Sequence, residues 1–182
     1  MGSTAAGTGI PAPEPEKTFW FRPPASQVTF YESVATEDDE MKIRTRDFGV
    51  IEIEDTSEIT FVSPILGFEN QSRFVFLNDD SIGSHFAFLQ SLEEPELCFI
   101  LADPHAVVAD YLPELPAAFE KQIGEEDCMC WLLVVLKDTL ENSTVNLKSP
   151  IVVNPSRRIA GQVVLEGDWP VRYPLVGGKG VR

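Results

Sequence analysis

The amino-acid sequence predicts a mainly β protein: a single antiparallel β-barrel-like domain with one short helix, preceded by a disordered acidic tail. About ten short apolar or alternating runs follow one another at close spacing, separated by Gly, Pro, Asn and Asp. A convincing helical pattern occurs only once, and 182 residues are enough for one globular domain with a well-formed core. Together these observations favour an antiparallel sandwich or barrel.

Residues 1–40 are expected to form the tail. They are rich in Pro, Ala, Gly and Glu and end in the acidic run 37–40, with seven acidic and two basic residues and a net charge of −5. Such a composition buries too little apolar surface to order itself. The cluster Phe19-Trp20-Phe21 is either a docking motif or a segment that folds back onto the domain. The start of the chain lacks the pattern of a signal peptide.

The domain is predicted to span residues 41–175 and to open with strands of alternating or β-branched pattern. Phe48-Gly49 separates the first two strands, and the loop 65–70 follows the third. Gly67 stands in that loop, where we expect the backbone to bend sharply. The strands predicted in this half are residues 41–46, 50–54, 59–62, 73–77, 86–91 and 97–101.

The second half contains the one predicted helix, residues 117–123, which ends at Gly124 as a C-cap. Residues 128–137 form a continuous apolar run, which is typical of a central strand buried on both faces. An extended arm begins at Trp169-Pro170, and residues 176–182 are expected to be a flexible C-terminus. The further strands predicted here are residues 144–147, 151–153 and 159–166.

The stretch 144–155 is punctuated by two Pro and two Asn residues. Pro150 blocks a helix and biases the residue before it to extended geometry. Residues 151–153 therefore read as a short buried strand, closed by the turn Asn154-Pro155. Asn146 and Asn154 flank this strand with side chains that can bind backbone groups. The stretch contains no nucleophile, metal-ligand cluster or phosphate-binding loop, so it favours a role in molecular shape and recognition over a role in catalysis.

The three cysteines, Cys98, Cys128 and Cys130, each lie inside an apolar run. Cysteines in such runs usually behave as small hydrophobes, and in a strand positions 128 and 130 face the same side. The spacing does not suit a zinc knuckle. We therefore predict buried thiols, no metal and no cofactor, in a reducing, cytoplasmic setting.

The formal net charge is −15, and residues 41–182 contribute 22 acidic against 12 basic residues. Such a surface repels nucleic acid and attracts basic partners, although solubility alone would also explain it. No helix-turn-helix or basic-aromatic pattern is present, so direct nucleic-acid binding is not expected. The longest apolar stretch, residues 129–136, is too short to span a bilayer, so no membrane is expected.

An enzymatic alternative rests on His85, Asp103 and His105, with Asp110 close by in the sequence. These side chains could form the metal site of a hydrolase if they met in a pocket that perturbs their pKa values. Asp103-Pro104 reads equally well as the end of a strand, however, and His85 lies in a predicted loop. No nucleophile elbow, Cys–His pair or phosphate loop is recognisable.

Residues 41–175 resemble the flagellar assembly factor FliW. Each motif alone is weak, but their order and spacing across most of the domain make the set specific. The resemblance is carried by Phe48-Gly49, Ile59-Thr60-Phe61, Leu66-Gly67-Phe68-Glu69, Arg73-Phe74-Val75, Leu89-Gln90-Ser91-Leu92, Pro95-Glu96-Leu97, residues 144–155, Gly161-Gln162-Val163-Val164-Leu165 and residues 170–175 (Pro-Val-Arg-Tyr-Pro-Leu). Three features depart from the family pattern: Pro64 stands where Gly is common, Phe88 where Trp is frequent, and the acidic tail lies outside the family core.

The resemblance implies a small, cytoplasmic β-barrel-like protein without enzymatic activity, monomeric when free. It implies binding to the translational repressor CsrA, which antagonises RNA binding by CsrA, and alternatively to flagellin, so that flagellin level is coupled to flagellin translation. A different alternative is an acidic nucleic-acid mimic that acts through its tail. The family-motif positions expected on or beneath binding surfaces are Leu66, Gly67, Phe68, Glu69, Gln90, Asn146, Lys148, Pro150, Asn154 and Pro155.

Overall fold

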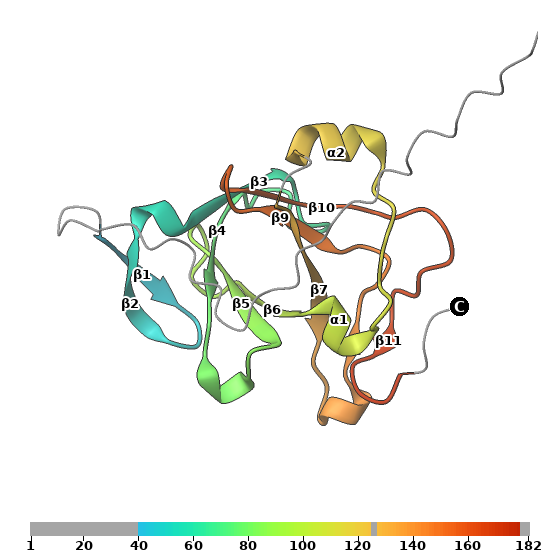
Figure 1. Ribbon diagram of the computed structural model, residues 1–182. Coiled ribbons are helices and arrows are strands. Elements are labelled where there is room, and N and C mark those ends of the chain that lie inside the picture. Colours follow the sequence, from blue (N-terminus) through green and yellow to red (C-terminus); the bar gives the residue numbers. More distant parts are fainter. Residues whose placement is uncertain (1–39, 125–126, 179–182) are drawn as a thin grey trace, which may run out of the picture.

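The computed structural model describes residues 40–124 and 127–178 (Figure 1). The tail up to residue 39, including the cluster Phe19-Trp20-Phe21, and the last four residues of the predicted flexible C-terminus lie outside the described residues. None of the helices in the described ranges has the length and apolar character needed to cross a membrane.

The described chain is built mainly from strands, joined by short turns. Two α-helices are present, α1 (Pro104–Val107) and α2 (Ala117–Ile123), together with the 3₁₀ turns η1 (Asp55–Ser57), η2 (Asp80–Ile82) and η3 (Leu140–Asn142). The strands are β1 (Glu40–Thr45), β2 (Gly49–Glu54), β3 (Glu58–Ser63), β4 (Arg73–Leu77), β5 (Phe86–Ser91), β6 (Cys98–Ala102), β7 (Met129–Val135), β8 (Thr144–Val145), β9 (Ile151–Asn154), β10 (Ile159–Gln162) and β11 (Tyr173–Pro174).

Seven strands close into a barrel. The order runs β7-β6-β5-β4-β3-β10-β9, and β9 pairs with β7 to complete the ring. Closure removes the free sheet edges that would otherwise template aggregation. Every neighbouring pair in the ring is antiparallel except β10 and β3, which run parallel. The predicted mainly β, barrel-like fold is confirmed, with this one parallel pair as an addition to it.

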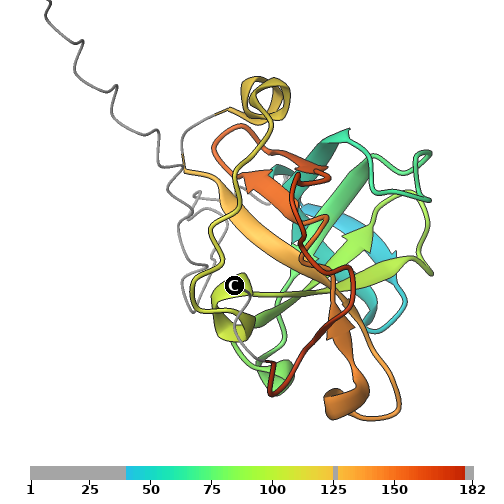
Figure 2. The same cartoon turned by 90° about the vertical axis from the view of Figure 1, so that its right-hand side faces the viewer.

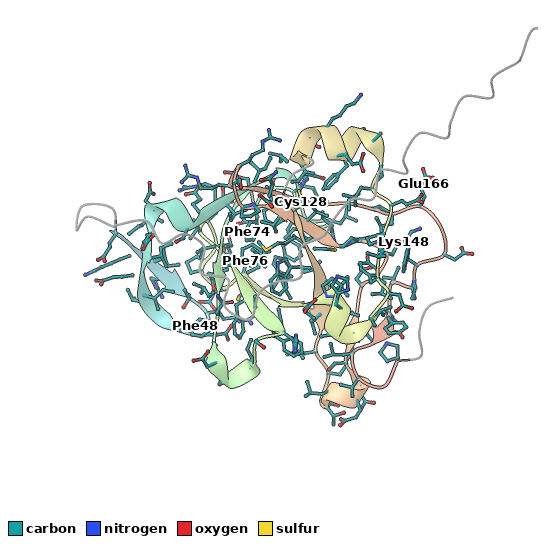
Figure 3. The ribbon with its side chains drawn as sticks, in the orientation of Figure 1. Phe48, Phe74, Phe76, Cys128, Lys148 and Glu166 are labelled. Atoms are coloured by element: carbon teal, nitrogen blue, oxygen red, sulfur yellow. The ribbon has the colours of Figure 1, made fainter. Side chains whose placement is uncertain are left out.

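A short two-stranded ribbon and a separate hairpin extend the barrel. Strands β8 and β11 continue the sheet beyond the end of β7 as a short ribbon. Figure 2 shows this ribbon and η3 at the opposite end of the molecule from α2. The hairpin β1–β2 forms a separate sheet that packs Ile43 and Ile53 over Val75 of β4. Because Phe74 and Phe76 of the same strand point into the barrel core, β4 is buried on both faces (Figure 3).

Strand β7 separates two hydrophobic cores. Met129 and Trp131 face the barrel interior, whereas the alternate residues Cys128, Cys130 and Leu132 face the core beneath α1, α2 and β11. This alternation is the period of two expected of a strand, with apolar partners on both sides. The prediction of a central strand buried on both faces is confirmed for its first four residues, and burial decreases toward Val135. All three cysteines are buried, as predicted, and within residues 40–124 and 127–178 none of them forms a disulfide.

The predicted element boundaries differ from the structure mainly after residue 100. Helix α1 was missed because four residues are too few to show a helical period; Asp103 caps it and Pro104 occupies its first position. The strand predicted at 144–147 stops at Val145, because the Asn146 side chain turns the backbone by accepting hydrogen bonds from Lys148 N and Ser149 N. Strand β10 likewise ends at Gln162, and β11 lies inside the predicted extended arm.

The predicted helix 117–123 and its C-cap are confirmed. Gly124 has φ +89°, a left-handed conformation that residues with a Cβ rarely adopt. A Cβ at this position would lie 2.9 Å from Nδ2 of Asn154. The end of α2 therefore packs directly on the turn that follows β9.

Candidate functional site

The loop between β3 and β4 presents apolar side chains to solvent. Leu66 is 59% exposed and Phe68 is 38% exposed, whereas Ile65 beside them is buried. The Phe68 N–H donates to the Ile65 carbonyl over 2.8 Å, and Gly67 between them has φ +87°. This is the geometry of a type II turn, which requires φ above zero at its third residue. The predicted sharp bend at Gly67 is therefore confirmed.

Gln162 holds the first half of this loop from below. Its side-chain Oε1 accepts a hydrogen bond from Leu66 N over 2.8 Å, and its Nε2 donates to the Ser149 carbonyl over 3.1 Å. Ser63 Oγ donates to the Gln162 carbonyl over 2.8 Å. Because Gln162 is itself buried, these bonds are shielded from water and fix the position of the loop on β10.

Glu93 fixes the second half of the loop. Its carboxylate accepts hydrogen bonds from Ser72 N over 2.6 Å, from Arg73 N over 3.2 Å and from Ser72 Oγ over 3.3 Å. The bond from the Ser72 backbone is the main cause that lowers the pKa of Glu93. The loop and the turn between β5 and β6 project from the same edge of the barrel, at the right in Figure 2.

An aromatic contact joins the loop to the barrel core. The Phe68 ring meets Phe99 edge-on, with centroids 4.9 Å apart and planes at 88°, and Phe99 in turn lies 6.3 Å from Phe74 in the core. Beside them the Glu69 carboxylate accepts a hydrogen bond from Gly67 N over 2.9 Å, which lowers the pKa of Glu69. The result is an apolar protrusion, Leu66 and Phe68, with an ionised carboxylate at its rim. We call residues 66–69 the apolar loop.

Gln90, another predicted site residue, lies fully inside the protein. Its Nε2 donates to the carbonyls of Ser91, Pro95 and Leu97, each over 3.0 Å. Its Oε1 accepts a 3.4 Å bond from Arg46 N, at the tip of the β1–β2 hairpin. The side chain therefore supports the turn after β5 and is not on the surface.

The predicted positions between residues 146 and 155 lie in a rigid, largely buried segment. Asn154 is 2% exposed; its Nδ2 donates to the Ile123 carbonyl over 3.0 Å, and its Oδ1 accepts from Arg157 N over 3.1 Å. Pro150 is buried, and Pro155 is half-buried within the turn after β9. These residues shape the backbone, and the same segment meets the loop through Gln162, which bonds both Ser149 O and Leu66 N.

Lys148 is half-buried and binds a backbone group. Its Nζ donates to the Gly167 carbonyl over 2.7 Å, in the segment that also carries Glu166 (Figure 3). The Leu165 N–H returns a 2.9 Å bond to the Lys148 carbonyl. Lys148 therefore fastens the chain that leaves β10 to the stretch 144–155.

The three residues of the hydrolase alternative do not form a metal site. His85 Nδ1 lies 3.4 Å from Asp103 Oδ2, but the other oxygen of Asp103 caps α1 by accepting from His105 N over 2.9 Å. The His105 ring lies instead 3.3 Å from the Ala109 carbonyl. Across residues 40–124 and 127–178, no group of three or more His, Cys, Asp or Glu is placed to hold a metal ion. The hydrolase alternative is not supported.

Some residues that build the site were not among the predicted ones. Gln162 and Phe99 support the apolar loop, yet Gln162 appeared only within a longer motif and Phe99 only within a strand. A polar residue in an otherwise apolar run, such as Gln162 before Val163, is a signal that could have identified the first. Phe99 carries no such signal, because its contact with Phe68 depends on how the loop after β3 packs against strand β6.

Comparisons with known proteins agree on one family. The family model described as FliW protein matches residues 42–175. The flagellar assembly factor FliW of Exiguobacterium sp. is 39% identical over 144 residues, covering 76% of this chain and 97% of that protein. The FliW of Geobacter sulfurreducens is 37% identical over 140 residues, covering 74% and 86%. A crystal structure of the flagellar assembly factor FliW superposes with a TM-score of 0.69 at 30% identity, covering 74% of this chain and 96% of that one.

Proposed function

The chain belongs to the FliW family of flagellar assembly factors, and from this premise we propose that it is a non-enzymatic, cytoplasmic protein that binds a CsrA-type translational repressor. Binding antagonises the RNA binding of the repressor. Flagellin is the alternative partner. When the flagellin level rises, flagellin displaces the repressor from this protein, and the released repressor silences flagellin translation. The free protein is proposed to be a monomer that binds neither nucleic acid nor membrane directly.

The apolar loop is the single observation that supports a binding role most directly. An exposed Leu and Phe on a fixed turn form an anchor of the kind that fills a pocket in a partner. Leu66 N bonds Gln162, and Ser72 N, at the end of the β3–β4 connection, bonds Glu93. These bonds hold the apolar loop in one shape before binding, so little conformational entropy is lost when a partner docks. We assign Leu66 and Phe68 to the contact and Glu69 to its rim.

Charge supports the proposed antagonism. A repressor that binds RNA presents a basic surface, and this chain carries a net charge of −15. Each pair of like charges brought into contact at a wet surface costs about 1 kcal/mol. Several carboxylates placed beside the repressor's RNA site would therefore lower its affinity for RNA by orders of magnitude, while attracting the repressor itself over long range.

Competition between the two partners tests the proposal. We expect the purified protein to retain CsrA in a pull-down and to release it when flagellin is added. The L66A/F68A variant should lose at least one partner, whereas V171A, a substitution at an equally exposed apolar side chain outside the loop, should retain both. Failure of the unaltered protein to bind either bait, or a stable complex holding both together, would contradict the proposal.

Salt tests the electrostatic part separately. Affinity for the repressor is expected to fall as ionic strength rises from about 0.05 M to about 0.5 M, because the Debye length shortens over that range. An affinity that does not change with salt would remove charge from the explanation while leaving the apolar loop in place.

The tail is proposed to be dispensable for partner choice, with residues 41–175 as the binding domain. A variant lacking residues 1–39 should bind both partners. Loss of RNA competition in this variant, with the domain still folded, would instead favour an acidic mimic that acts through the tail.

A further inference from the structure

The turn between β5 and β6, residues 92–97, packs against the connection that carries the apolar loop. Ser91 Oγ donates to Gln71 Oε1 over 2.7 Å, and Gln71 N donates to the Phe68 carbonyl over 2.9 Å. The Phe68 ring also contacts Phe99, near the start of the strand that follows the turn. The apolar loop and the turn therefore form one surface.

Buried side chains fix the shape of this turn. Ser91 Oγ accepts hydrogen bonds from Glu93 N over 3.1 Å and from Glu94 N over 3.0 Å. Ser91 is 1% exposed, and Gln90, which donates to two carbonyls of the turn, is fully buried. The turn is thus held in one shape before a partner arrives, so docking loses little conformational entropy.

Negative charge gathers on the same surface. Residues 64–72 and 92–97 contain no Lys or Arg and four glutamates, Glu69, Glu93, Glu94 and Glu96. Two arginines lie near the turn, and each is already paired, Arg46 with Asp47 over 2.8 Å and Arg73 with Glu58 over 2.6 Å. Because each of these pairs is neutral overall, the surface keeps the charge of the glutamates. We call residues 92–97 the acidic turn.

The four glutamates have different roles. The Glu93 carboxylate is committed to the backbone N–H groups of Ser72 and Arg73. The other three are exposed, and none of them forms an ion pair with another residue of the ranges 40–124 and 127–178. Glu93 therefore supports the surface, whereas the other three carboxylates are offered to a partner.

Such a surface discriminates between partners by charge. An apolar anchor needs a pocket in the partner, and carboxylates beside that anchor lose water when the pocket closes over it. A partner with cations around the pocket replaces the lost water by ion pairs, whereas an uncharged or acidic partner leaves the carboxylates unpaired. Of the two partners proposed above, the repressor is the one that must be basic, because it binds RNA phosphates.

We propose that the apolar loop and the acidic turn together dock the repressor, whose cations surround a pocket that receives Leu66 and Phe68. This inference rests on the proposed function and deepens it, because it adds the acidic turn to the contact and assigns the surface to the repressor, not to flagellin. Flagellin needs to overlap this surface only in part to displace the repressor. Glu69, Glu94 and Glu96 pair with the cations of the repressor.

A charge-removal variant of the full-length chain tests the assignment. E69Q/E94Q/E96Q removes three charges but keeps the side-chain oxygens that accept hydrogen bonds from Gly67 N and Glu96 N. Its affinity for the purified repressor should fall about tenfold at about 0.05 M salt and about twofold or less at about 0.5 M, because salt screens exposed charges. Its affinity for flagellin should not change. The matched control E114Q/D138N/E141Q, at three exposed acids elsewhere in the chain, should leave both affinities unaltered.

Photo-cross-linking locates the contact without relying on charge. The full-length chain with Glu94→p-benzoylphenylalanine is irradiated with the purified repressor or with flagellin, and the products are identified by mass spectrometry. Position 94 should link to the repressor in higher yield than to flagellin. The same group at exposed Glu141 of η3 is the control and should link to neither.

Three results would overturn the inference and leave the proposed function standing. Unchanged affinity of E69Q/E94Q/E96Q for the repressor at low salt would mean that the acidic turn is not part of the contact. An equal loss for both partners would mean that the surface does not select by charge. A link from position 94 to flagellin but not to the repressor would reverse the assignment.

Failure of the unaltered protein to bind the repressor is a different result, because it contradicts the proposed function itself. A thermal melt shows whether E69Q/E94Q/E96Q folds like the unaltered protein. If it melts at a lower temperature, the cross-link at position 94 decides, because that variant keeps Glu69 and Glu96.

Discussion

The apolar loop and the stretch 144–155 both carry family motifs, but the structure uses them in opposite ways. The loop turns apolar side chains outward, with Leu66 and Phe68 exposed. The stretch turns polar side chains inward, where the Asn154 amide bonds two backbone groups and is almost fully buried. A polar residue at a motif position can thus be a structural support, and an apolar one can be the contact surface.

The two regions are connected through Gln162. This side chain takes a hydrogen bond from the loop at Leu66 and gives one to the stretch at Ser149. Buried polar groups of this kind are costly unless satisfied. Among the described residues, Trp131 Nε1 is the one buried side-chain nitrogen or oxygen without a hydrogen-bond partner, so each buried polar side-chain atom beneath the loop has at least one. The stretch acts as the base that keeps the loop in position.

The largest effect on stability is expected from N154A. The substitution leaves the Ile123 carbonyl and Arg157 N without their partner in a buried site, at a cost of about 2–4 kcal/mol in the free energy of unfolding. Urea denaturation measures it, with the exposed N142A as the matched control. Wild-type stability in N154A would show that the stretch is not a structural support.

A smaller loss of stability but a wider consequence is expected from Q162A. Removing the acceptor of Leu66 N and the donor to Ser149 should cost about 1–3 kcal/mol in the free energy of unfolding. It should also release the loop and weaken partner binding, although the Gln162 side chain is itself buried. S143A is the comparison, because the buried Ser143 hydroxyl bonds Lys137 N and the Thr139 carbonyl beside η3, away from the loop. If both variants weaken binding equally, loss of stability alone explains the effect.

The strand pattern was readable from the sequence because alternation is local. Residues 73–77 and 86–91 were predicted with the bounds that the structure has. The closure of the barrel could not be predicted in detail from the sequence. The β3–β10 pairing joins segments far apart in the chain, and the β7–β9 pairing passes over β8. The same limit applies to the site: one sequence shows that Gln90 and Phe68 belong to motifs, but burial depends on tertiary packing, which makes the first a support and leaves the second exposed.

Charge reversal at Lys148 is expected to act on the fold. K148E replaces a donor to the Gly167 carbonyl with an acid next to Glu166 and Asp168, so it should cost about 1 kcal/mol in the free energy of unfolding. K137E, at an exposed lysine on the β7–β8 turn, controls for the change in net charge. If K148E kept the stability of the unaltered protein but lost a partner, Lys148 would belong to the contact surface and not to the base.

The smallest effect on stability is expected from L66A. More than half of this side chain is already exposed, so the substitution should change the free energy of unfolding by no more than about 0.5 kcal/mol. Its backbone N–H still reaches Gln162, so the loop keeps its shape while losing its most exposed apolar group. Urea denaturation and titration calorimetry with each partner would separate the two properties. If L66A lost stability but kept its partners, Leu66 would be structural and the distinction between loop and base would fail at its clearest residue.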